Sequence, residues 1–297
     1  MKQSLSTPKR SELLLTEWRR QLTLSNYEYS QFKSELDQLD DQIKRLKNKH
    51  LKITVFGKVG VGKSSLLNAL LNKGIFATDI THGSTQHDQV AIWDQSIQYL
   101  KSIEFIDTPG IDEIKQTKSI RVASKVSCQS DLILFVLDSD ITQLELEALE
   151  VLQAHRKPIV LVLNRCDQWD SCELKELIKS IKNRLPHQAR NIPIQTVSAA
   201  PRRSKVLSNG KTRSQKYPPN IKNLRNYLIT LLNEQGRLIM SLNSLRHADS
   251  FYKALKAERL KKGKASAQSL IGKFAVLKAS GVAVNPLLML DFTTSLA

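Results

Sequence analysis

The sequence predicts an α/β protein with a mainly parallel six-stranded sheet, covered by helices on both faces and flanked by helical extensions at both ends. Two observations predict this class. Short apolar segments rich in β-branched residues alternate with amphipathic helical segments across residues 51–235. Residues 1–50 and 236–297 instead follow a helical pattern. Strands that alternate with helices form parallel sheets buried on both faces.

The predicted elements follow one another in a regular order. The first strand, Lys52–Phe56, leads through a glycine-rich loop into a helix at Lys63–Leu71. Ligands of such sheets bind at the carboxyl ends of the strands, so polar residues there are candidate site residues. The other strands are predicted at Val90–Trp93, Ile103–Ile106, Leu132–Leu137, Ile159–Leu163 and Ile192–Val197, and further helices at Gln143–His155 and Leu174–Asn183.

The N-terminal extension, residues 1–50, is predicted to be helical with one apolar stripe, because its apolar residues recur three and four positions apart. The stripe consists of Phe32, Leu36, Leu39, Ile43 and Leu46. In one interpretation it packs on its own domain or on the C-terminal helices. In the other it pairs with a partner as a coiled coil.

The segment 201–223 differs from its surroundings. It carries many Lys and Arg residues, no acidic residue, and the breakers Gly210, Pro218 and Pro219. We interpret it as a basic, exposed and flexible loop, and the alternative is a nucleic-acid contact. A long helix is predicted after it, at Leu224–Leu260.

The end of the chain, Gly281–Ala297, contains Asp291 as its one charged residue and no helix stop signal. We expect either a truncated chain or one that ends inside a further domain. No apolar run reaches transmembrane length, and the N-terminus carries no signal-peptide core.

Composition narrows the classes of partner. The 297 residues include 45 Lys and Arg against 28 Asp and Glu, a net charge of +17. This balance favours an acidic partner such as RNA, DNA or an anionic membrane surface, and charge alone does not choose among them. The three cysteines, Cys128, Cys166 and Cys172, form no CxxC pair, which argues against a disulfide framework or a zinc site and for the cytoplasm.

A loop with the pattern GxxxxGK[ST] follows the first predicted strand. Glycines let the backbone wrap around phosphate oxygens, and the positive end of the next helix faces the anion. Lys63 is placed to contact the β and γ phosphates, and the Ser64 hydroxyl to bind magnesium. The candidate nucleotide-binding residues here are Gly57, Lys58, Val59, Gly60, Val61, Gly62, Lys63, Ser64 and Ser65.

The sequence Asp107-Thr108-Pro109-Gly110 ends the third predicted strand. An aspartate at this place can hold magnesium through water, and Gly110 can offer its amide to the γ-phosphate. The segment therefore predicts a loop that senses the γ-phosphate.

Thr85 is the candidate for a switch threonine, which binds magnesium in the GTP state and releases it after hydrolysis. Thr78 and Thr81 are the alternatives. Together with Lys63 and Gly110, Thr85 makes up the predicted catalytic set.

The sequence Asn164-Arg165-Cys166-Asp167 follows the strand Ile159–Leu163. Guanine presents its N1–H and its amino group side by side, and the Asp167 carboxylate can accept both bonds, whereas adenine offers no such pair. Asn164 can tie this loop to the phosphate loop, and the stem of Arg165 can cover one face of the base. Small residues after the last strand, Ser198 and Ala199, can offer a backbone amide to guanine O6.

Together these motifs resemble the translation-factor class of small GTPases, and within it the bacterial Era- and TrmE-like group, over roughly residues 51–235. The resemblance implies a P-loop GTPase domain that binds GTP or GDP with Mg²⁺. Asp107–Glu113, Asp131–Thr142 and Gly281–Asp291 also resemble Era-like GTPases that continue into a C-terminal hydrophobic domain of unknown function, which suggests membrane association.

Two positions depart from related patterns. Era-like loops read Gly-x-Pro-Asn-x-Gly-Lys-Ser, and their Asn helps to bind an activating potassium ion. Val59 and Gly60 replace Pro-Asn here, so potassium activation is not expected. Ile111 stands where Ras-like enzymes carry a glutamine that orients water, which implies slow intrinsic hydrolysis completed by another chain or by a shifted loop.

Three functions stay open at this level. The first is a GTP-hydrolysing switch in the cytoplasm, peripheral to a membrane. The second is an Era-like GTPase that acts on RNA or in ribosome assembly, although no RNA-binding signature follows residue 235. The third is a GTP-dependent scaffold whose helices bind a protein partner.

Overall fold

The structure is a computed structural model that describes residues 7–76, 89–111, 116–206 and 212–261. It divides into two compact units. The first, which we call the sheet unit, contains Lys52–Gln98 and Ser102–Glu234. The second, the helical unit, contains residues 7–51, Tyr99–Lys101 and residues 235–261 of the described chain.

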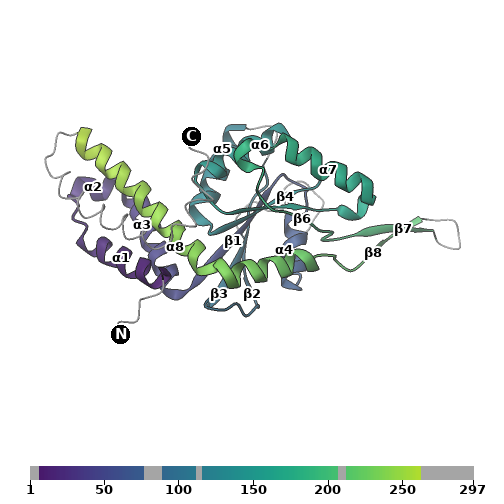
Figure 1. Cartoon of the computed structure of the whole chain (residues 1–297), viewed down its shortest axis with the longest axis horizontal. Helices are drawn as coiled ribbons and strands as arrows, with labels where there is room; N and C mark the ends of the chain where they lie inside the picture. Colours follow the sequence, from purple (N-terminus) through teal and green to yellow (C-terminus); the bar gives the residue numbers. More distant parts are fainter. Residues whose placement is uncertain (1–6, 77–88, 112–115, 207–211, 262–297) are drawn as a thin grey trace. The chain divides into compact units, whose positions relative to one another are not determined.

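The sheet unit is built on a six-stranded sheet in the order β2-β3-β1-β4-β5-β6 (Figure 1). β1 pairs in parallel with β4, β4 with β5 and β5 with β6, whereas β2 runs antiparallel to β3. The predicted α/β class with a mainly parallel sheet is therefore confirmed. The strands are β1 (His50–Gly57), β2 (Gln89–Trp93), β3 (Ser102–Asp107), β4 (Leu132–Leu137), β5 (Ile159–Leu163) and β6 (Ile194–Thr196).

Five helices accompany this sheet along the chain. α5, α6 and α7 contribute to one continuous core, in which Phe56 of β1 and Phe135 of β4 meet edge to face with ring centroids 5.6 Å apart. Every residue of β4 and β5 is buried, as expected for central strands covered on both faces. The helices are α4 (Lys63–Leu71), α5 (Gln116–Gln129), α6 (Gln143–Ala154), α7 (Ser171–Arg184) and α8 (Lys222–Lys261).

Hydrogen bonds join α4 to the first part of α8. Arg225, near the start of α8, donates hydrogen bonds to the carbonyl oxygens of Ala69 and Leu70 in the last turn of α4. A guanidinium at this place satisfies carbonyl groups that have no partner within the helix. α4 is thereby fixed at its C-terminus, opposite the end that begins at Lys63.

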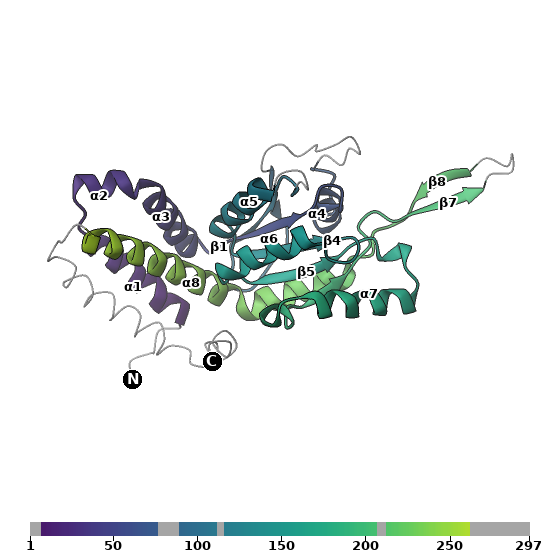
Figure 2. The same cartoon turned by 90° about the horizontal axis from the view of Figure 1, so that it is seen from above.

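Residues 201–223 differ from the predicted loop. Two short strands, β7 (Arg202–Val206) and β8 (Thr212–Lys216), pair in an antiparallel hairpin. The predicted breakers do not interrupt it, because Pro218 and Pro219 follow β8 and Gly210 lies between the strands in the sequence. Figure 2 shows this hairpin, in green, separate from the six-stranded sheet.

The helical unit contains α1 (Thr7–Gln21), α2 (Asn26–Gln31), α3 (Lys33–Asn48) and the later residues of α8. The five stripe residues predicted from the sequence are all buried. Phe32 and Trp18 meet Phe251 of α8 edge to face, with centroids 5.8 and 6.3 Å away. The stripe is therefore buried within the same chain, and its first residue, Phe32, packs against the C-terminal helix.

A buried ion pair joins α2 to the end of α8 in the helical unit. The Arg259 guanidinium donates to the Glu28 carboxylate at 2.7 Å, and both side chains are buried. This hydrogen bond holds the pKa of Glu28 at about 2, although burial opposes the shift. Glu28 also closes a capping box with Ser25, which starts α2 and interrupts the predicted N-terminal helix. None of the helices in the described part of the chain combines the length and hydropathy needed to cross a bilayer.

Candidate functional site

The glycine-rich loop links the end of β1 to the start of α4. Gly60 and Gly62 have φ angles of +85° and +90°, in the left-handed region that favours glycine. A Cβ atom on Gly62 would also lie 2.5 Å from the Asn164 amide nitrogen. A side chain at Gly62 is therefore excluded by the backbone conformation and by the neighbouring loop.

Lys63 lies in the first turn of α4 and points back over this loop. Its ammonium group donates to the carbonyl oxygens of Gly57 at 3.1 Å and Lys58 at 2.8 Å. Burial lowers the pKa of Lys63 to about 8, and the nearby Asp107 carboxylate opposes the shift. The charge is thus held where the amides and the N-terminus of α4 already favour an anion.

The position of Lys63 predicts a pH dependence of phosphate binding. The pKa of Lys63 is about 8 in the folded protein, whereas its ordinary value is 10.5. Between these two pH values the unfolded chain therefore binds more protons at Lys63 than the folded chain does. The contribution of Lys63 to the free energy of unfolding without ligand therefore rises with pH across the window. A bound phosphate favours the charged form, so binding takes up a proton near pH 8, and affinity falls as pH rises further.

Isothermal titration calorimetry with GDP, in buffers of different ionisation enthalpy, measures this proton uptake. We expect uptake at a pH near the Lys63 pKa of about 8 and none well below it, where the amine is already charged. Equal heats in all buffers at the higher pH would contradict the assignment.

Ser64 and Asp107 meet beside Lys63. The Ser64 hydroxyl donates to the Asp107 carboxylate at 2.5 Å, and Asp107 is fully buried at the end of β3. The next residue, Thr108, donates its hydroxyl to the Val55 carbonyl of β1 at 2.8 Å and so fixes the start of the loop. A serine hydroxyl and a carboxylate are oxygen ligands of the kind that Mg²⁺ takes together with phosphates and water, so these residues fit a magnesium ion.

The segment after Asp107 runs close beside the glycine-rich loop. Ile111 donates its amide to the Gly57 carbonyl at 3.1 Å, and the Val59 amide donates to the Ile111 carbonyl at 3.4 Å. A Cβ atom on Gly110 would lie 2.6 Å from the Val59 nitrogen, so the approach requires glycine. The Ile111 side chain is 2% exposed and belongs to the core beneath α5, α6 and α7.

The Asn164 side chain joins its own loop to the phosphate loop and to the loop that carries Ala199. Its amide nitrogen donates to the Val61 carbonyl at 2.9 Å, and its amide oxygen accepts from the Ala199 amide at 3.0 Å. Its own backbone amide donates to the Leu137 carbonyl of β4 at 2.7 Å. Asn164 is buried, so all three bonds form away from water.

Arg165 adds a second connection between the loops. Its guanidinium donates to the Gly60 carbonyl at 2.5 Å and pairs with the Asp138 carboxylate at 2.9 Å. Asp138 was not predicted as a site residue. It directly follows the buried strand β4, so its place at the carboxyl end of a central strand was the signal that could have identified it.

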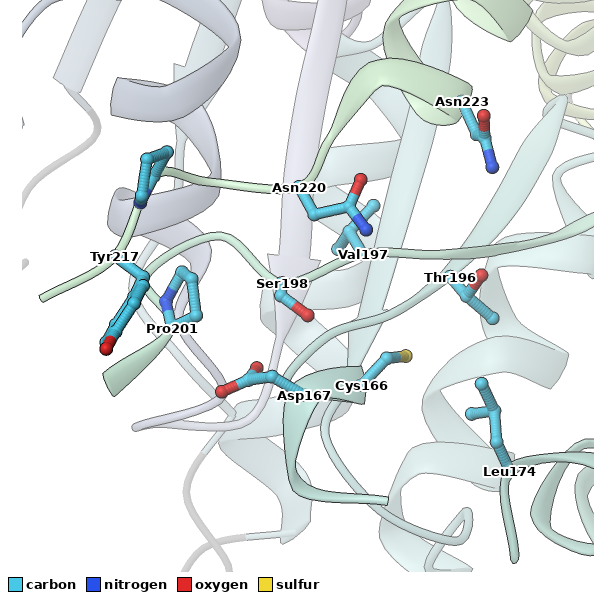
Figure 3. Close-up of a pocket in the computed structure, with 11 residues that line it drawn as sticks. Cys166, Asp167, Leu174, Thr196, Val197, Ser198, Pro201, Tyr217, Asn220 and Asn223 are labelled. Carbon is cyan, nitrogen blue, oxygen red and sulfur yellow. The ribbon is translucent and has the colours of Figure 1, made fainter. Parts of the chain in front are cut away.

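Asp167 borders a cavity of about 470 Å³ at the ends of β5 and β6. Ser198 also lines this cavity, as do Pro201 and Tyr217 at the base of the β7–β8 hairpin (Figure 3). The last two residues were not predicted, because nothing in their local sequence marks a site. Asp167 itself is exposed to solvent.

The predicted site residues therefore gather at one edge of the sheet. The phosphate loop, the Asp107 segment and the Asn164 loop are joined by the hydrogen bonds above, and Ser198 and Ala199 lie next to them. Ser65 follows Ser64 in α4 and is half buried. Thr85, with Thr78 and Thr81, lies outside the residues that the structure describes.

Residues 52–165 match the family described as 50S ribosome-binding GTPase. The chain is 37% identical over 148 residues to the tRNA modification GTPase MnmE of Thermoanaerobacter sp. (strain X514), covering 46% of the chain and 30% of the relative. It is 30% identical over 197 residues to GTPase Der of Campylobacter concisus (strain 13826), covering 64% of the chain and 40% of the relative. This domain is a P-loop GTPase, similar to those of MnmE and Der.

The P-loop GTPase domain is the part that these relatives share with this chain. The chain spans less than half the length of MnmE and Der, at 30% and 40%. Among solved structures, a variant of Aquifex aeolicus Era bound to GDP·AlF₄⁻ is similar, with 24% identity, a TM-score of 0.47, and 61% of this chain and 56% of that one covered.

Proposed function

We propose that the chain is a guanine-nucleotide switch that binds GTP and GDP with Mg²⁺ and hydrolyses GTP slowly without a partner. One observation carries the proposal. The buried Asn164 side chain joins Val61 of the phosphate loop to Ala199, next to the loop that presents Asp167. A phosphate site and a base site held by one residue fit a nucleotide that spans both.

Each site residue has a role in this proposal. The Lys63 ammonium contacts the β and γ phosphates, and the Asp167 carboxylate accepts from N1–H and the amino group of guanine. The amide of Ser198 or Ala199 donates to guanine O6. Ser64, Asp107 and Thr85 hold the Mg²⁺ ion, which when bound neutralises charge on the phosphates.

Slow hydrolysis follows from the place of Ile111. The side chain at this position is directed into the hydrophobic core rather than toward the phosphate loop. It has no hydrogen-bonding group with which to orient a water molecule, and it is almost fully buried. The proposal therefore assigns this task to another chain or to a shifted loop.

We expect GTP turnover by the purified protein to be slow and equal in sodium and potassium salts. Gly60 stands where a potassium-binding Asn would be needed. The measurement is phosphate release under saturating GTP and Mg²⁺ in the two salts at matched ionic strength. Strong stimulation by potassium would refute this interpretation of Gly60, and a fast rate in both salts would refute the assignment of Ile111.

The acidic partner that we propose for the switch is RNA. The family that matches residues 52–165 is described as ribosome-binding, and the relative MnmE as a tRNA modification GTPase. The chain itself carries a net charge of +17. The net charge suits an anionic membrane surface as well, and the further reason to expect that partner, the resemblance over residues 281–291, concerns residues outside those that the structure describes. Protein that floats with anionic vesicles despite excess RNA would favour the membrane.

A further inference from the structure

The β7–β8 hairpin begins and ends beside the residues proposed to read the base. The Ser198 amide donates to the Asn220 carbonyl at 3.0 Å, and the Asn220 amide donates back to Ser198 at 2.9 Å. One step further out, the Tyr217 amide donates to the Pro201 carbonyl at 2.9 Å. The hairpin therefore starts directly after the loop that carries Ser198. At this base, the two chain segments are joined by backbone hydrogen bonds in antiparallel pairing.

This closure brings two rings next to Asp167. Figure 3 shows the Asp167 carboxylate directed to the side of the cavity where the rings of Pro201 and Tyr217 lie. The Cys166 thiol is directed to the other side, and it donates to the Leu163 carbonyl. The carboxylate and the two rings thus share one part of the cavity.

The two rings differ in what they leave exposed. Pro201 is buried, whereas Tyr217 keeps 42% of its surface exposed. A ligand that enters the cavity to reach Asp167 would cover more of the tyrosine ring. Aromatic rings of proteins stack on bases with little dependence on sequence, because every base has a flat π-face.

We infer that Pro201 and Tyr217 form one wall of the guanine site and that Tyr217 contacts the bound base beside its amino edge. This inference rests on the proposed function, since the base reaches the wall through its bonds to Asp167. The hairpin is then part of the nucleotide site.

The test is the dissociation rate of a fluorescent GDP analogue with the label on the ribose. Tyr217→Ala is expected to release the nucleotide roughly tenfold faster, because it removes the base–aromatic contact. Tyr217→Phe keeps the ring and is expected to stay near the wild-type rate. Tyr29→Ala is the matched control, since Tyr29 is similarly exposed, at 50%, but belongs to α2 of the helical unit. A wild-type rate for Tyr217→Ala would overturn the inference.

A second measurement on the wild-type protein does not depend on the variant being folded. Tetranitromethane modifies accessible tyrosines, and peptide mass spectrometry reports each one. GDP is expected to protect Tyr217 and to leave Tyr27 and Tyr29 unchanged. Equal modification of Tyr217 with and without GDP would overturn the contact.

Failure of the proposed guanine site and failure of the Tyr217 contact give different results. If wild-type protein does not bind GDP, or if Asp167→Asn keeps wild-type affinity for it, the proposed base-reading site is wrong and the inference falls with it. If binding is tight and depends on Asp167 while Tyr217→Ala behaves as wild type, only the role of the hairpin is wrong.

Discussion

Lys63→Ala is expected to abolish nucleotide binding, with a loss of affinity for GTP and GDP of roughly a thousandfold or more, because charge-assisted bonds to phosphate are removed from a buried site. The ammonium of Lys63 is positioned by the carbonyl oxygens of Gly57 and Lys58, to which it donates hydrogen bonds. Fluorescent GDP titration measures the loss. Unchanged affinity would rule out the phosphate-loop assignment.

The matched control for this variant is Lys73→Ala, an exposed lysine just after α4. It changes the net charge equally and leaves the loop untouched, so it is expected to bind as wild type. Urea unfolding of both variants without nucleotide separates lost binding from lost folding. Because the burial of Lys63 disfavours its charged form, removing the charge is not expected to unfold the domain.

Asp167→Asn is expected to exchange specificity rather than to abolish binding. The new amide donates where the carboxylate accepted, so it is mismatched to the amino group of guanine and matched to the 2-oxygen of xanthine. Leaving polar groups of a site unpaired lowers affinity by on the order of a hundredfold or more. We expect GTP to bind that much more weakly and xanthosine triphosphate to bind better than GTP.

Competition of the two triphosphates against a fluorescent nucleotide measures this exchange. Asp94→Asn is the control, because Asp94 is an exposed aspartate that follows β2. Retained selectivity for GTP in Asp167→Asn would remove Asp167 from its base-reading role. Loss of both nucleotides together with a lower unfolding free energy would indicate a structural role instead.

The sheet was predictable where burial is complete. β4 and β5 match the predicted strands residue for residue, since wholly apolar segments bounded by polar residues or proline leave little choice of limits. β6 is shorter than predicted because Ile192 donates its amide to the preceding turn, at Ala189, instead of to β5. α7 starts earlier than predicted, because Asp170 caps it together with Glu173.

Other elements depend on contacts that no local pattern encodes. α5 was not predicted, since few apolar residues mark it in the sequence, although Ala123 and Val126 are buried. The β7–β8 hairpin was expected to be a loop, and its root is closed by pairs about twenty residues apart, such as Ser198 with Asn220.

The candidate site also contains residues that the sequence predicts and residues that only the folded chain brings together. The loops that carry Lys63, Asp107 and Asn164 were predicted from motifs, because phosphate and guanine recognition require those residue types at those spacings. The partner of Arg165 at Asp138 and the ring of Tyr217 beside Asp167 were not predicted. They arise from the juxtaposition of strand ends and of a hairpin root, which only the folded chain shows.

The single side chain of Asn164 has a thermodynamic consequence. Guanosine and pyrophosphate, offered as separate fragments, would each have to order loops that share this one amide. The fragment that bound first would order the loops, so the second fragment would pay a smaller entropic cost. Each fragment would therefore raise the affinity for the other by the same factor. A whole nucleotide would then bind more tightly than the sum of its halves predicts, and the excess would measure how far Asn164 makes the two ends of the site one cooperative unit.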